Sequence, residues 1–190
     1  MKRRGIGITI LFMAVLCASV PFTVMAESVQ EKREDIMRLA EQTLDQLYQM
    51  APGARQAVRD AAGYGVFSDR GLKIFMFGSG LGKGVVINNA TKKATYMVMG
   101  EVQYGLGFGI SKFRQVFVFQ TQDALNNFIT YGVTLGAQVT GAAQAGGQGG
   151  SIAGAISVAP GVWVYQITEA GLAAELGITG AKNFKDSELN

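Results

Sequence analysis

The glycine-rich segment from Phe77 to Gly84 is the part of the sequence whose residue types come closest to a known chemistry. Glycine amides can cradle a phosphate group, and Lys83 stands beside them. A Walker phosphate loop, however, needs a glycine five residues before its Gly-Lys pair and a hydroxyl directly after it. Phe77 and Gly84 occupy those two positions. We therefore predict that these glycines serve turns, bulges or close backbone packing.

Residues that usually carry catalysis are sparse. The chain has no histidine, and its single cysteine is Cys17, which excludes a Ser-His-Asp triad and a histidine metal site. The acidic residues of the central region are scattered, and no spacing among them selects a site. They are Asp60, Asp69, Glu101 and Asp123. We predict a protein that is not an enzyme and that needs no metal or cofactor.

Basic residues gather between Arg70 and Arg114, where Glu101 is the only acid. Such a local excess of positive charge is typical of a surface that meets phospholipid head groups. Taken one at a time, each of these residues is equally an ordinary solvated charge. The predicted lipid-binding residues are Lys73, Lys83, Lys92, Lys93, Lys112 and Arg114.

The segment from Gly105 to Gly109 alternates glycine with apolar residues at the period of a strand. One face of that strand would carry no side chains, so another backbone, an aromatic ring or an acyl chain could lie against it. Close packing inside the protein and a ligand groove are both open at this point.

The elements that position these residues follow a simple order, with helices first and strands afterwards. Ser28 and Glu31 form a capping-box pattern that opens a helix from Val29 to Met50, and a shorter helix follows from Pro52 to Gly63. We expect strands at Tyr64–Phe67, Leu72–Phe77, Gly84–Asn88, Ala94–Val102, Gly105–Ile110, Gln115–Phe119, Val162–Ile167 and Leu172–Ile178.

The connecting segments also carry local signals. A hairpin loop is predicted from Asn88 to Lys93, and Thr121 is expected to cap a short helix that ends before Gly132. Gln144–Gly150 reads as a mobile loop, and the residues from Lys182 onward read as a polar tail. The fold class is therefore α+β, with N-terminal helices followed by an antiparallel β-rich domain that is sandwich-like or barrel-like.

The first 26 residues have the form of a secretory signal. Three basic residues precede an apolar run from Ile6 to Val20, and small residues lead to a cleavage site after Ala26. A lipoprotein processed at Cys17 is the alternative. Because those three residues belong to 17 basic ones in all, residues 27–190 keep 14 basic against 14 acidic residues. Their net charge is zero, which argues against broad attraction to nucleic acid.

The order of several motifs resembles the SYLF domain family over about Ile36 to the C-terminus. The resemblance rests on Ala62–Phe67, Gly78–Val86, Gly105–Gly109, Val116–Phe119, Leu135–Ala137 and Tyr165–Leu172. It implies a helix-preceded, antiparallel domain that binds phospholipid, with actin binding confined to some eukaryotic members. The chain lacks the Trp-Ser-x-Pro element that is usual in those members, so the resemblance does not extend to actin.

These observations lead to one principal functional prediction and one alternative. Residues 27–190 are expected to form a single periplasmic domain that binds anionic phospholipid or a membrane surface through basic loops on a glycine-rich β scaffold. The alternative is a structural or scaffolding envelope protein that docks a partner protein through its N-terminal amphipathic helix. An outer-membrane barrel fits less well, because a helix leads the chain and glycines interrupt the strands.

Overall fold

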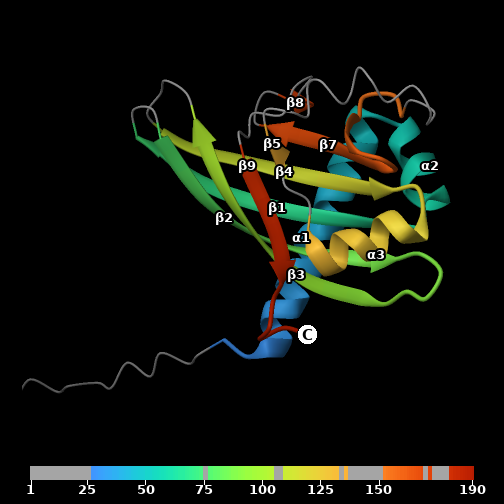
Figure 1. The fold of residues 1–190 in the computed structure, drawn as a ribbon, viewed down its shortest axis with the longest axis horizontal. Helices are drawn as coiled ribbons and strands as arrows, with labels where there is room; N and C mark the ends of the chain where they lie inside the picture. Colours follow the sequence, from blue (N-terminus) through green and yellow to red (C-terminus); the bar gives the residue numbers. More distant parts are fainter. Residues whose placement is uncertain are drawn as a thin grey trace, which may run out of the picture.

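The described part of the chain combines three helices with one antiparallel sheet. The computed structural model describes residues 27–74, 77–104, 109–132, 135–136, 152–168, 171–172 and 180–190. Within these residues nine strands form a sheet in the order β5-β9-β3-β2-β1-β4-β7-β6, with β8 paired to β7. The sheet curls into a half-barrel (Figure 1), and the predicted α+β class is confirmed.

The elements have the following bounds. The helices are α1 (Val29–Met50), α2 (Gly53–Asp60) and α3 (Gln122–Tyr131). The strands are β1 (Gly63–Ile74), β2 (Phe77–Asn88), β3 (Ala94–Tyr104), β4 (Gly109–Phe119), β5 (Leu135–Gly136), β6 (Ile156–Ala159), β7 (Val162–Thr168), β8 (Gly171–Leu172) and β9 (Gly180–Lys185). Every strand pairing among them is antiparallel.

The predicted caps of the helices are confirmed. Ser28 and Glu31 form a complete capping box at the start of α1, in which each side chain accepts a hydrogen bond from the other residue's backbone N–H. The hydroxyl of Thr121 accepts the N–H of Ala124 at the start of α3, and the helix ends at Gly132. The helix that was predicted from Pro52 begins at Gly53, with Pro52 as its cap residue.

Three predicted strand breaks are wrong. The expected strand Tyr64–Phe67 and the first part of Leu72–Phe77 are joined in β1, which ends at Ile74, and the strand expected at Gly84–Asn88 begins at Phe77. The end of the strand expected at Gly105–Ile110 continues into Gln115–Phe119 within β4. Glycines weaken a strand in isolation, but β1 pairs with β2 on one side and β4 on the other in an unbroken register. Pairing along both edges of β1 therefore overrides the local glycine signal.

Gly84 shows why a glycine is needed in β2. A Cβ atom at this position would overlap the backbone oxygen of Val66 and the ring of Phe67. The prediction of close backbone packing is confirmed there, within a continuous strand. The hairpin loop predicted from Asn88 to Lys93 is also confirmed, as the connection between β2 and β3.

The residues from Lys182 onward are not only a polar tail. Gly180–Lys185 forms β9, which pairs with β3 and places Lys182 opposite Gly100. Several other predictions fall wholly or partly outside the described residues. They are the signal at 1–26, most of the strand at Gly105–Ile110, the loop at Gln144–Gly150 and most of the strand at Leu172–Ile178.

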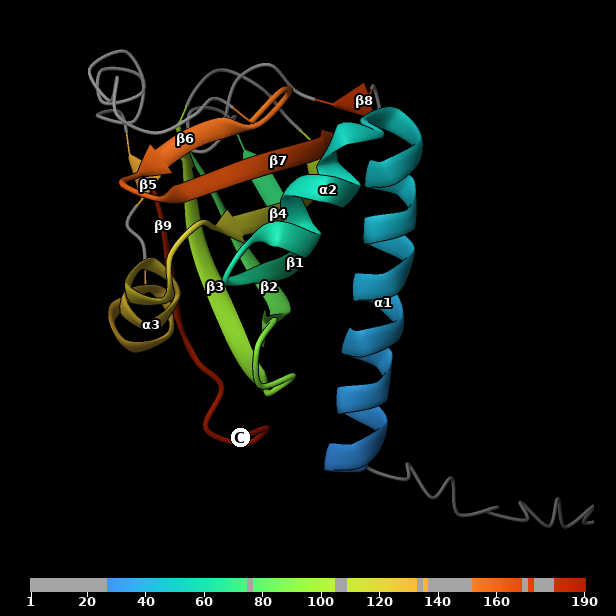
Figure 2. The same cartoon turned by 90° about the vertical axis from the view of Figure 1, so that its right-hand side faces the viewer.

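The sheet lies between two helical layers. Figure 2 shows α1 and α2 on one face and α3 on the other. Side chains alternate between the faces along each strand, so Val66 packs with the α1 and α2 cluster while Phe67 packs with the α3 cluster. In the α3 cluster, Phe117 and Phe128 contact each other, and both contact Phe67 and Phe119.

The helices do not cover the whole sheet. In Figure 1 the β1–β2 and β3–β4 hairpins project to one side, away from the three helices. On the α1 side, the apolar residues of α1 pack over Val66, Val85 and Val116. Positions further along the same strands continue this face beyond the helix.

Candidate functional site

An inner row of five residues crosses the sheet on the α1 side. The register pairs Phe184 with Val98, Val98 with Lys83, Lys83 with Ser68, and Ser68 with Arg114. Val66 and Val116 lie two residues from Ser68 and Arg114, and both pack beneath α1. Residues two apart in a strand share a face, so this row lies on the α1 side of the sheet.

An outer row runs parallel to it, one step further from the helices. It consists of Lys182, Gly100, Leu81, Arg70 and Lys112, each opposite the next across neighbouring strands. Neighbouring strands lie about 4.8 Å apart, and Arg70 and Lys112 occupy directly opposed positions in the register.

We call the two rows the basic sheet face. Its ten positions carry five basic residues and no acidic one. The basic residues are Arg70, Lys83, Lys112, Arg114 and Lys182. They come from four different strands, so the sheet gathers them although they are far apart in the chain.

The described side chains of this face are accessible. Lys83 and Lys182 are exposed, and the apolar side chains of Leu81 and Phe184 are 74% and 47% exposed. Arg114 is half-buried, and its Nη1 donates a 2.8 Å hydrogen bond to Oε1 of Gln46 in α1. Exposed cations beside exposed apolar side chains suit the boundary between a bilayer's head groups and its acyl region.

The structure divides the six predicted lipid-binding residues among three places. Lys83, Lys112 and Arg114 lie on the basic sheet face. Lys73 pairs with Gly78 and Gly109 and, by strand alternation, belongs to the opposite face. Lys92 and Lys93 are exposed in the β2–β3 turn. The expectation of basic loops thus holds for these two turn residues, whereas the other four lie in strands.

Sequence reasoning left two basic and two exposed apolar members of this face out of the predicted site. The basic ones are Arg70 and Lys182, and the apolar ones are Leu81 and Phe184. The available signal was the two-residue period, because Leu81 precedes Lys83 and Lys182 precedes Phe184 by one strand repeat. Reading the segment after Lys182 as a tail hid the second of these pairs.

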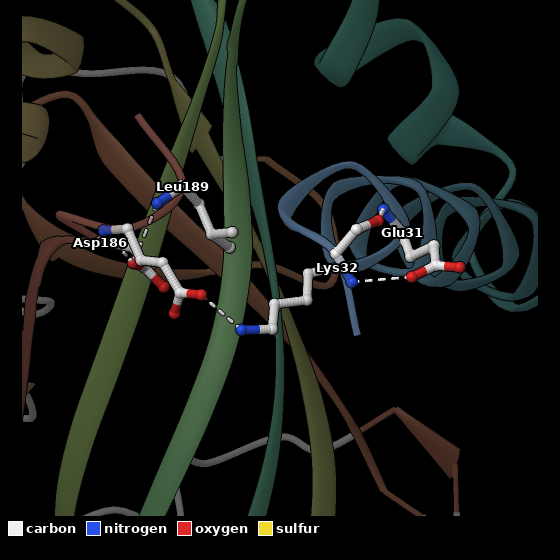
Figure 3. Close-up of polar contacts among 6 residues, drawn as sticks. Glu31, Lys32, Asp186 and Leu189 are labelled. Atoms are coloured by element: carbon white, nitrogen blue, oxygen red, sulfur yellow. Dashed lines mark hydrogen bonds and ion pairs between the residues drawn. The ribbon is translucent and has the colours of Figure 1, made fainter. Parts of the chain in front are cut away.

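The C-terminal segment closes against α1 near the β2–β3 turn. Figure 3 shows Lys32 reaching from α1 to this segment, where its Nζ lies 2.5 Å from Oε1 of Glu188. This hydrogen bond raises the pKa of Lys32 above its usual 10.5. Asp186 accepts hydrogen bonds from the backbone N–H groups of Glu188 and Leu189. Leu189 is 1% exposed and packs in the α1-side core.

Two tyrosines near α2 also have shifted acidities. Burial raises the pKa of Tyr48 and of Tyr64. Both rings line a pocket of about 340 Å³ with Arg55, whose guanidinium carbon lies 4.3 Å from the Tyr48 ring centre. Arg55 therefore stacks on Tyr48 as a cation–π pair.

The described residues contain no group of three or more His, Cys, Asp or Glu side chains arranged to hold a metal ion. No helix in that part of the chain is both long enough and apolar enough to cross a bilayer.

The chain is similar to a protein named Beta cell expansion factor A from Aeromonas veronii. The two sequences are 29% identical over 163 residues, which cover 86% of this chain and 60% of the relative. The chain thus spans less than two thirds of that relative's length. No protein-family model matches the sequence.

Proposed function

We propose that this chain is a non-catalytic protein of the cell envelope that binds anionic phospholipid through its basic sheet face. The single observation that carries the proposal is the outer row, in which Lys182, Arg70 and Lys112 flank the exposed Leu81. A bilayer surface offers both anionic phosphates and an apolar layer beneath them. The row offers complementary groups for both.

Membership in the SYLF family is part of this proposal. Its support is the order of the motifs in the sequence together with a curled antiparallel sheet that follows an N-terminal helix. A signal cleaved after Ala26 would deliver residues 27–190 to the periplasm. Actin binding has no support from these observations.

In the scaffolding alternative, only part of the α1 surface is left for docking a partner. The apolar face of α1 is occupied, because Ile36, Ala40 and Leu47 are buried against the sheet. A partner would have to bind the polar face of the helix, and deleting α1 would also remove part of the core. Charge reversal on the exposed face of α1 is therefore the cleaner test of docking.

Co-sedimentation with vesicles tests the lipid proposal. The protein should sediment with phosphatidylglycerol vesicles, should not sediment with phosphatidylcholine vesicles, and should be released by salt. Each basic residue near an anionic surface contributes about 1 kcal/mol, so Lys83→Glu with Lys182→Glu should weaken binding about thirtyfold or more. Equal binding to both vesicle types would overturn the proposal.

Two further double variants sharpen this experiment. Arg38→Glu with Arg59→Glu makes the same charge change at side chains that are 68% and 70% exposed elsewhere, and it should have a much smaller effect. Lys92→Glu with Lys93→Glu reverses the turn lysines. Because these lie beyond the far end of β2 from Leu81, binding through the sheet face predicts a smaller loss for them than for Lys83 and Lys182.

A further inference from the structure

A groove of about 520 Å³ lies at the other end of the β2–β3 hairpin from the basic sheet face's outer row. Three segments that are far apart in sequence form it: the first half of α1, the β2–β3 turn with the start of β3, and the C-terminal segment. The lining residues that matter for its chemistry are Arg33, Glu34, Lys93, Tyr96, Lys185 and Leu189.

Arg33 is fixed in this groove by two contacts. Its Nε donates a 3.0 Å hydrogen bond to the backbone oxygen of Leu189, and its guanidinium carbon lies 5.6 Å from the centre of the Tyr96 ring. Only one of its five N–H donors is needed for the Leu189 oxygen. A planar guanidinium that is already oriented can present its remaining donors as a pair to the oxygens of one anion.

Two lysines add positive charge from the other walls. Lys93 comes from the β2–β3 turn and Lys185 from the end of β9, and both are exposed. Glu34 is the acidic residue among the described lining residues, and its Oε1 accepts a 2.8 Å hydrogen bond from Nε2 of Gln30. Among the side chains of the described lining, three are cationic and one is a carboxylate, which already has a partner on its own helix.

The floor of the groove is held by the amide of Asn190. Its Nδ2 donates to the backbone oxygens of Tyr96 and Asp186 at 2.7 and 2.6 Å, and its Oδ1 accepts the N–H of Tyr96 at 3.0 Å. These bonds fasten the C-terminal segment to β3. This part of the lining is therefore preorganised, which lowers the entropic cost of binding.

We propose that this groove binds one phosphate group of a phosphomonoester, with Arg33, Lys93 and Lys185 as its ligands. The site is separate from the basic sheet face and does not depend on the proposed membrane function. A phosphomonoester carries close to two negative charges at neutral pH and several acceptor oxygens, which matches one oriented guanidinium and two ammonium groups. The same group occurs in phosphatidic acid and in soluble organic phosphates.

Titration with sn-glycerol 3-phosphate, followed by amide chemical shifts of the ¹⁵N-labelled protein, tests the site. The amide signals of Lys93 and Tyr96 should move and saturate at one equivalent. The variant Lys93→Gln with Lys185→Gln should bind at least about tenfold more weakly, because it loses two charge-assisted hydrogen bonds. Arg38→Gln with Arg59→Gln is the matched control and should bind as the parent protein does.

Two results would overturn the proposal. One is the absence of saturable shifts at Lys93 and Tyr96, and the other is equal weakening in both double variants. Binding to vesicles that contain either phosphatidic acid or phosphatidylglycerol distinguishes a lipid head group from a soluble phosphate as the ligand. If Lys93→Gln with Lys185→Gln weakens binding only to vesicles that contain phosphatidic acid, the ligand is a lipid head group. If the variant weakens binding only to glycerol phosphate, the ligand is a soluble phosphate.

A failure of the phosphate-groove proposal can be distinguished from a failure of the membrane-binding proposal. The sheet-face variant Lys83→Glu with Lys182→Glu tests vesicle binding, and glycerol phosphate tests the groove. Loss of one property with retention of the other shows which of the two proposals is wrong.

Discussion

Arg114 and Gln46 are joined by a 2.8 Å hydrogen bond from Nη1 of the guanidinium to Oε1 of the amide. This contact links β4 to α1 at the point where the helix stops covering the sheet. It orients one cation of the basic sheet face, while Lys83, across Ser68 in the same row, is exposed. The face therefore combines one anchored cation, Arg114, with exposed lysines at positions 83 and 182.

Replacing Gln46 tests this link. Gln46→Ala leaves the half-buried guanidinium of Arg114 without its acceptor and should lower the free energy of unfolding by about 1 kcal/mol. Urea unfolding followed by circular dichroism measures the change. Gln42→Ala, at an exposed position of the same helix, is the control and should stay within about 0.5 kcal/mol of the parent protein. An equal loss in both variants would contradict the assigned role of the bond.

The glycine at position 84 should not tolerate even a methyl group. Gly84→Ala places its Cβ against the backbone oxygen of Val66 and the ring of Phe67, so it should cost about 1–3 kcal/mol of unfolding free energy. Gly53→Ala provides the opposite case, because nothing lies within 4 Å of an added Cβ in α2. It should stabilise the protein by about 0.5–1 kcal/mol. Thermal unfolding of both variants separates these outcomes, and a neutral Gly84→Ala would show that β1 and β2 are not packed as described.

The capping box of α1 gives a pH dependence with a defined sign. Hydrogen bonds from Ser28 lower the pKa of Glu31 below its usual 4.5. A carboxyl group with a lowered folded-state pKa stabilises the protein fully above its unfolded-state value. That stabilisation is lost as the pH falls through the lower, folded-state value. Glu31→Gln should therefore flatten the acid limb of a plot of stability against pH, whereas Glu41→Gln on the same helix is the comparison. An unchanged acid limb in Glu31→Gln would argue against the capping role.

Leu81 should matter for membrane binding and not for folding. Its side chain is 74% exposed, so Leu81→Ser should change the unfolding free energy by no more than about 0.5 kcal/mol. Burying a leucine in an apolar layer is worth about 1.5–3 kcal/mol, so affinity for phosphatidylglycerol vesicles should fall about tenfold. Sedimentation and urea unfolding of one preparation measure both quantities. A destabilised variant, or one with unchanged vesicle affinity, would remove Leu81 from the interface.

The sequence predicted local elements well where chemistry at a single position decides them. Ser28 with Glu31, and Thr121 with Gly132, mark helix ends through backbone hydrogen bonds that a few neighbouring residues determine. The strands were harder, because whether Gly78 to Gly84 forms a break or a strand depends on partners elsewhere in the chain. The pairing of β2 with both β1 and β3 is a tertiary property.

The candidate site also combines features that the local sequence predicts with features that depend on strand pairing. The basic excess between Arg70 and Arg114 was visible in the sequence, and three of the six predicted residues share one face. Lys73 falls on the opposite face because it is an odd number of residues from Ser68 in an unbroken strand. Lys182 joins the face only through the pairing of β9 with β3, which no local pattern encodes.

An environment-sensitive fluorophore on the sheet face tests most directly whether this face meets the bilayer. Residues 27–190 contain no cysteine, so single cysteines introduced into them by Leu81→Cys and Asn126→Cys carry the label. Asn126 is exposed on α3, on the other side of the sheet. With phosphatidylglycerol vesicles, the emission of the label at position 81 should shift to the blue, while the label at position 126 should not respond. A blue shift at position 126, or none at position 81 despite sedimentation with the vesicles, would contradict binding through the basic sheet face.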